Sequence, residues 1–166
     1  MIPIKNIFKR GSEKDTNFIG SLKKIIGFKP GKSVYYEKAL THRSTNRTDE
    51  LGNPISYERL EFLGDSVLSA VIAHYLFDKT PSGDEGYLTK MRSKVVSRKH
   101  LNEIGKELEL SSLMDTKIPL SQFGENIHGN LFEALTGAVF LDKGYNTCEQ
   151  FIYKTVIRPH VNIDSL

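Results

Sequence analysis

The chain has 166 residues, of which 39% are hydrophobic and 26% are charged. This length and composition are those of about one globular domain, and they exclude a disordered or fibrous chain. The single cysteine, Cys148, excludes a disulfide framework and any cysteine-based zinc site within one chain. The formal net charge is only +3, so on its own it says little about partners.

The charges fall into four zones of alternating sign. Residues 1–48 carry 11 Lys/Arg and 3 Asp/Glu, a net of +8, and residues 49–89 carry 2 and 8, a net of −6. Residues 90–100 carry 5 and 0, a net of +5, and residues 101–166 carry 5 and 9, a net of −4. An acidic centre between basic flanks suits a metal-dependent enzyme that acts on a polyanion. Solvated helix faces of varied sign are the simpler alternative.

The spacing of apolar residues predicts helices and no strands. Residues 1–15 are polar and basic, lack the apolar core of a signal peptide and are expected to form a flexible tail. Beyond them apolar residues recur with the 3.6-residue period of helices, and no segment keeps the two-residue period of a strand. Seven helices are expected, in chain order at 17–28, 35–40, 57–78, 84–96, 97–108, 127–142 and 146–157.

These helices predict one all-α domain over residues 16–160, followed by a C-terminal tail or the start of a linker at 161–166. No run of about 18 uninterrupted apolar residues is present, so no membrane partner is expected. A single free cysteine agrees with a reducing compartment, and the cytoplasm is the expected location.

Three acidic residues on the long helix at 57–78 form the first candidate site. Glu58, Glu61 and Asp65 are spaced i, i+3 and i+7, which places them on one face of a helix. Charged groups are rarely buried unless they are paired or bind a metal. The stripe therefore indicates either a metal site or a solvated acidic face, and spacing alone does not decide between them.

A second helix, at 127–142, favours the metal site. Nearly every residue from Gly129 to Leu141 is apolar or small, which is typical of a buried helix, yet Asn130 and Glu133 share one of its faces. Small residues at Gly129, Ala134 and Gly137 would allow another helix to approach closely. If the two helices pack, oxygen ligands suited to Mg²⁺ would converge from Glu61, Asp65, Asn130 and Glu133.

Other kinds of site have weaker support. The five histidines are scattered, without the spacing of a zinc site. Ser66 lacks a Gly-x-Ser-x-Gly context, and Cys148 is expected to be a packing residue. No glycine-rich phosphate-binding loop is present, so no nucleotide cofactor is expected.

Four blocks of sequence together resemble the ribonuclease III family. The most specific is the run of eleven residues that reads ERLEFLGDSVL, and the other three blocks occur in the order in which the family has them. The resemblance covers roughly residues 18–161, and it is to the endonuclease domain of the bacterial type. The blocks are 58–68, 39–44, 84–86 with 91–92, and 133–142.

The resemblance implies an all-α endonuclease domain that works as a homodimer on double-stranded RNA. Cleavage would use Mg²⁺, with Mn²⁺ able to substitute, and would leave 5′-phosphate and 3′-hydroxyl ends. The implied roles are the processing of rRNA and mRNA. A metal-dependent phosphohydrolase acting on small substrates is a weaker alternative, because the His-Asp pattern common in such helical enzymes is missing.

The family's functional residues map onto positions in both acidic helices. The resemblance implies that Asp65 and Glu133 are catalytic and that Glu61, Asn130 and Glu133 bind the metal. Two further acids of the family near the cleavage site match Glu58 and Glu85.

The remaining matches concern the partner subunit and the RNA. Phe62 matches an aromatic knob that family members insert into the second subunit, although a plain core phenylalanine is the alternative. Phosphate contacts are expected mainly from the basic cluster at 90–99, since double-stranded RNA is read largely by shape and backbone. The expected RNA-binding residues are His42, Arg43, Lys90, Arg92, Lys94, Arg98 and Lys99.

One residue departs from the family pattern, which usually has aspartate at the position of Asn130. An amide keeps one carbonyl oxygen but loses a negative charge, so metal affinity is expected to fall. The favoured interpretation is an active enzyme. The alternative is a weakened or inactive dimeric protein that binds RNA or the ribosome.

The chain stops near the point where many family members begin a linker to a double-stranded-RNA-binding domain. The sequence shows no such domain after residue 160. A natural minimal form and a piece trimmed from a longer protein would both explain this, and the trimmed piece is the favoured expectation.

Overall fold

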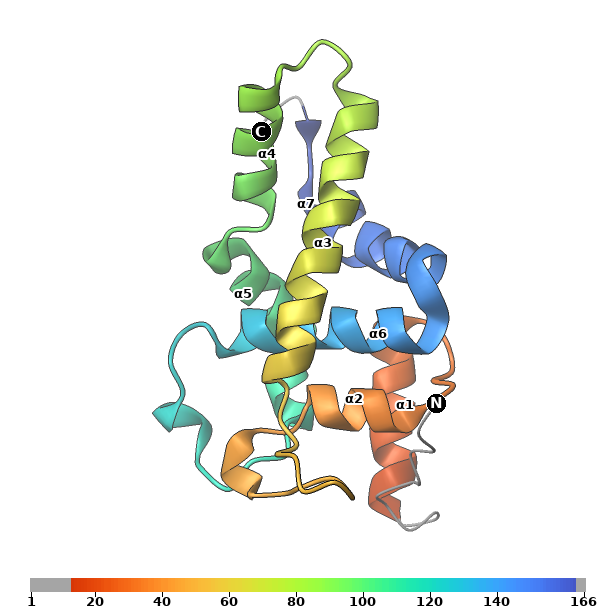
Figure 1. Ribbon diagram of the computed structural model, residues 1–166, viewed down its shortest axis with the longest axis vertical. Helices are drawn as coiled ribbons and strands as arrows, with labels where there is room; N and C mark the ends of the chain where they lie inside the picture. The colour runs from red at the N-terminus through yellow and green to blue at the C-terminus, as the bar shows by residue number, and fades with distance from the viewer. Residues whose placement is uncertain (1–12, 164–166) are drawn as a thin grey trace.

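The structure, a computed structural model, describes residues 13–163. This part of the chain is helical apart from turns and two isolated backbone bridges (Figure 1). The predicted all-α class is therefore confirmed. The helices are α1 Glu13–Ile26, α2 Ser33–Ala39, α3 Glu58–Lys79, α4 Glu85–Val95, α5 Arg98–Glu107, α6 Ile127–Ile152 and the short α7 Arg158–His160.

Helix boundaries follow the sequence signals closely. Asp84 caps the start of α4 by accepting a hydrogen bond from the Tyr87 N–H at 2.8 Å, and Ser97 caps α5 in the same way through His100. The break expected between the helices at 127–142 and 146–157 lies at Gly144, where φ is 78° and the backbone is not helical, and α6 comprises the helical stretches on both sides of this kink. Most of the expected tail at 1–15, and residues 164–166, lie outside the described residues, while α1 begins at Glu13.

Helix α3 is the central element, and α6 runs across its N-terminal half (Figure 1). Side chains from both helices meet in the core, because their apolar stripes face each other. Leu68 and Ile72 of α3, and Leu131 and Leu135 of α6, are fully buried. This pair of helices carries every acidic residue of the predicted metal site, so its packing sets the geometry of that site.

Two glycines let α3 and α6 meet backbone to backbone. A Cβ atom added to Gly64 would overlap the backbone carbonyl of Glu133, and one added to Gly137 would overlap that of Leu60. Gly137 was expected from the sequence to permit such an approach, and the structure shows that it does. Because no larger residue fits at either position, the helices are held at the short separation that glycine allows.

A buried carboxylate fastens α2 to α6. Asp142 accepts hydrogen bonds of 2.8 Å from the backbone N–H groups of Gly31 and Lys32 and from the Tyr36 hydroxyl. These bonds satisfy N–H groups at and just before the start of α2 that have no partner within the helix. The segment leading to α2 is thereby fixed to the helix that carries Glu133.

The length and composition of α3 are also those of a helix that could cross a membrane. Among the described residues it is the one helix that passes this test. Its apolar stripe is buried and packs on α6, as expected for the central helix of a packed core. Its first turn also carries acidic residues.

Replacing Gly64 with alanine tests the close crossing. Gly64→Ala should lower the free energy of unfolding by about 3 kcal/mol or more, because the added methyl group meets rigid backbone rather than a movable side chain. Gly20→Ala in α1 is the matched control, since nothing lies within 4 Å of its added Cβ. It should gain about 0.5–1 kcal/mol. Equal effects of the two substitutions in urea unfolding would contradict the crossing described here.

Candidate metal and nucleic-acid site

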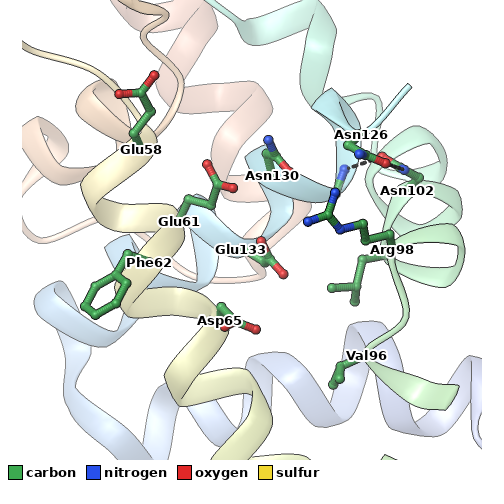
Figure 2. A pocket seen from close by; sticks show the side chains of 12 residues that line it. Glu58, Glu61, Phe62, Asp65, Val96, Arg98, Asn102, Asn126, Asn130 and Glu133 are labelled. Carbon is green, nitrogen blue, oxygen red and sulfur yellow. Dashed lines mark hydrogen bonds between the residues drawn. The ribbon is translucent and has the colours of Figure 1, made fainter. Parts of the chain in front are cut away.

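An acidic pocket of about 490 Å³ opens where α3 faces the beginnings of α5 and α6 (Figure 2). Glu58, Glu61 and Asp65 line it from α3, and Asn130 and Glu133 line it from α6. The structure therefore brings together the side chains whose convergence was expected from the two helix patterns. Their individual roles remain predictions.

Burial and mutual repulsion make the charged form of these carboxyl groups unfavourable. Desolvation, followed by the negative charges of Asp65 and Glu61, raises the pKa of Glu133 to about 7. The pKa of Glu61 is also raised, chiefly by desolvation and then by Glu58. Arg98 acts on both groups in the opposite direction. A further positive charge in the pocket would relieve the remaining repulsion.

The donor set of the pocket fits a hard divalent cation. It offers carboxylate and amide oxygens and no sulfur or imidazole, which is the preference of Mg²⁺ and Mn²⁺. Within residues 13–163, no three His, Cys, Asp or Glu side chains are already gathered into a coordination cluster. Mg²⁺ commonly keeps several of its waters and takes one or two carboxylates directly, so such a cluster is not required.

Two asparagines that the sequence analysis missed support the pocket. Asn102 of α5 is 9% exposed, and its Oδ1 accepts a hydrogen bond of 2.8 Å from the Gly129 N–H in the first turn of α6. Its Nδ2 donates to Oδ1 of Asn126 at 3.2 Å. These bonds, with the close approach of α5 at Gly129, fix the turn of α6 that carries Asn130. Nothing in the local sequence of α5 distinguishes Asn102 from a surface residue.

Several predicted residues lie outside the pocket lining. Glu85 is in the first turn of α4, beyond the far end of α3, where it accepts a hydrogen bond from Thr89. The basic residues Lys90, Lys94 and Lys99 are exposed, and Arg92 is half-buried. Of the seven expected RNA-binding residues, Arg98 alone lines the pocket.

The loop before α3 positions His42 and Arg43. The His42 imidazole accepts a hydrogen bond from the Ser44 N–H at 3.1 Å, and its ring packs against Phe123 with centroids 4.7 Å apart. Desolvation lowers the pKa of His42. Arg43 forms an ion pair of 3.6 Å with Glu58, which links this loop to the edge of the pocket.

Phe62 projects from α3 with 78% of its surface exposed. The alternative of a plain core phenylalanine is therefore wrong for this chain. Phe62 also contributes to the pocket lining (Figure 2). Cys148, by contrast, is fully buried, as expected of a packing residue.

Comparison with known proteins identifies the family. Residues 33–160 match the family described as Ribonuclease-III-like. The chain is 57% identical over 164 residues to Ribonuclease 3 of Flavobacterium psychrophilum, an alignment that covers 98% of this chain and 67% of that protein. The chain belongs to the ribonuclease III family. A second Ribonuclease 3, from Zunongwangia profunda, is 57% identical over 166 residues and covers 100% and 68% of the two chains.

A solved structure agrees with this assignment. The ribonuclease III nuclease domain of Campylobacter jejuni superposes with a TM-score of 0.74 at 27% identity, covering 86% of this chain and 98% of that one. The expected fold, the nuclease domain of the ribonuclease III family, is thus confirmed, and so is the expectation of a ribonuclease III-type enzyme.

Proposed function

We propose that this ribonuclease III-type chain cleaves double-stranded RNA by Mg²⁺-dependent hydrolysis and leaves 5′-phosphate and 3′-hydroxyl ends. The observation that carries the proposal is the acidic pocket, whose carboxylates come from the two helices that hold the family's motifs. Relatives at 57% identity that are named Ribonuclease 3 support the same activity. Processing of rRNA and mRNA in the cytoplasm belongs to this proposal.

Glu61 and Glu133 would hold the cation directly, with the Asn130 carbonyl as a weaker ligand, and Asp65 would orient water. Mn²⁺ would serve in place of Mg²⁺, because both accept the same oxygen donors. The cation, when bound, would supply a water of lowered pKa and would stabilise charge on the leaving oxygen. Water would add to the phosphorus as the bond to the 3′ oxygen breaks, with one proton of the water passing to solvent and the 3′ oxygen taking up a proton to become the 3′-hydroxyl. Glu133 would act in this reaction as a charged carboxylate that holds the cation.

The exposed basic residues of α4 and α5 would hold the RNA backbone. Lys90, Lys94 and Lys99 are accessible to phosphates, and they follow one another along two consecutive helices. Such contacts release counterions, so RNA binding should weaken as the salt concentration rises. His42 and Arg43 would contribute from the loop that adjoins Glu58.

The proposal includes a homodimer in which Phe62 contacts the partner. A large apolar side chain with 78% exposure is costly in an isolated subunit and is typical of an interface anchor. The work on the Campylobacter jejuni domain concerns flexibility in a region involved in dimer formation of that protein. Glu85 lies away from the pocket of its own chain, so an accessory role would require the partner subunit.

An active enzyme is favoured over an inactive protein that only binds RNA. Glu61, Asp65 and Glu133 are all present and line one pocket, whereas Asn130 is the single departure. An amide at this position lowers the negative charge of the pocket without removing an oxygen ligand. We therefore expect a working enzyme that needs more Mg²⁺ than an aspartate-containing relative.

A cleavage assay on long double-stranded RNA tests the function. The chain should give discrete short products with Mg²⁺ or Mn²⁺ and none with EDTA. Glu133→Ala should lower the rate at least about 100-fold, because it removes a direct ligand of the cation. Glu103→Ala, on α5 and outside the pocket lining, is the matched control and should cleave normally.

The same assay is applied to Asn130→Asp. This substitution restores a negative charge to the pocket and should lower the Mg²⁺ concentration needed for half-maximal cleavage. RNA binding without any cleavage in either metal would contradict the proposed activity and favour the inactive alternative.

The dimer is tested by Phe62→Ala in sedimentation. Loss of this anchor should weaken the dimer at least about tenfold, as for a central interface residue. Leu51→Ala, another exposed apolar residue but in a loop before α3, should leave the dimer unchanged. An equally stable dimer after Phe62→Ala would refute the assignment of Phe62.

A further inference from the structure

Arg98 is the one Lys or Arg side chain in the lining of the acidic pocket among the described residues. It stands at the first position of α5, directly after the capping residue Ser97. Figure 2 shows its side chain extending from α5 toward Glu133 and Asn130. The neighbouring Lys99 is exposed but does not line the pocket.

The guanidinium of Arg98 is near the carboxylates without being neutralised by one of them. Its positive charge lowers the pKa of both Glu61 and Glu133, so it acts on acids of both helices. Yet no ion pair within 4 Å joins Arg98 to any acid in residues 13–163. Its planar array of N–H donors thus remains available to a ligand that enters the pocket.

A cation beside metal-binding acids has a cost, because it repels the metal ion. The lining carries four carboxylates, Glu58, Glu61, Asp65 and Glu133, so a divalent cation leaves the fully charged pocket with a net negative charge. An approaching RNA phosphate would add another negative charge. Arg98 lines the same pocket as the acids and would offset that repulsion, and its fork of donors matches two phosphate oxygens.

We propose that Arg98 binds the phosphate that is cleaved, within the acidic pocket, whereas the other basic residues of α4 and α5 hold the RNA backbone outside it. The inference rests on the proposed function and assigns one cation to the reaction itself. Arg98 and Asn130 then act in the same direction, because each makes the pocket less negative toward an incoming phosphate.

The test compares Arg98→Gln with Lys79→Gln, which removes a positive charge in the last turn of α3, outside the pocket lining. At saturating RNA and Mg²⁺, Arg98→Gln should lower the single-turnover cleavage rate about 100-fold, as when a charge-stabilising donor is removed. Arg98→Lys should recover part of this loss, since it keeps the charge but not the fork. Lys79→Gln should leave the rate unchanged, whereas Lys99→Gln should weaken RNA binding, with a smaller salt dependence.

A second measurement separates this role from a structural one. Mn²⁺ binding without RNA, followed by electron paramagnetic resonance, should become several-fold tighter in Arg98→Gln, because a repelling charge is gone. Slower cleavage with tighter metal binding is the expected pair of results. Slower cleavage with weaker metal binding would overturn the inference, since Arg98 would then merely hold the carboxylates in place.

The unchanged chain sets the reference for these outcomes. If it cleaves RNA and the rates of Arg98→Gln and Lys79→Gln fall equally or not at all, the inference fails while the proposed function stands. If the unchanged chain does not cleave RNA in either metal, the proposed function fails and the inference fails with it.

Discussion

The contact of α3 with α6 at Gly64 and Gly137 controls the rest of the molecule. Because both positions lack a side chain, the two backbones meet, and the acids on each helix face a common pocket. Burial also removes water from the Glu133 carboxyl, which is the main cause of its raised pKa. The packing of the two helices therefore brings the acids together.

The arrangement of the carboxyl groups in the pocket is electrostatically unfavourable. Carboxyl groups that repel one another and lack water favour a protonated state, and the folded chain keeps them together because the core around them is well packed. The anchoring of α2 by Asp142, and of the α6 start by Asn102, holds the supporting helices in place. A bound cation would offset this repulsion, so the stability of the pocket would depend on the metal.

Two further residues of the pocket lining make its charge less negative. Asn130 contributes an oxygen without a charge, and Arg98 contributes a positive charge that no acid neutralises within the described part of the chain. Both features would weaken attraction for a metal ion and reduce repulsion of a phosphate. The balance between these effects, rather than the presence of the acids alone, would set the rate of the enzyme.

The sequence alone was sufficient to predict the helices and to place the acidic residues on them. Apolar periodicity located α3 and α6, and the spacing of Glu58, Glu61 and Asp65 placed them on one face, because helix geometry is local. It could not show that Arg98 enters the pocket or that Asn102 supports α6. Those contacts join residues from different helices, and they depend on how the helices cross.

The most direct test is a titration of the Glu133 carboxyl by NMR, without and then with Mg²⁺. The account predicts a pKa of about 7 in metal-free protein and a marked fall when Mg²⁺ is added, because the cation stabilises the charged form. A pKa close to the ordinary value of 4.5 that does not respond to Mg²⁺ would contradict it.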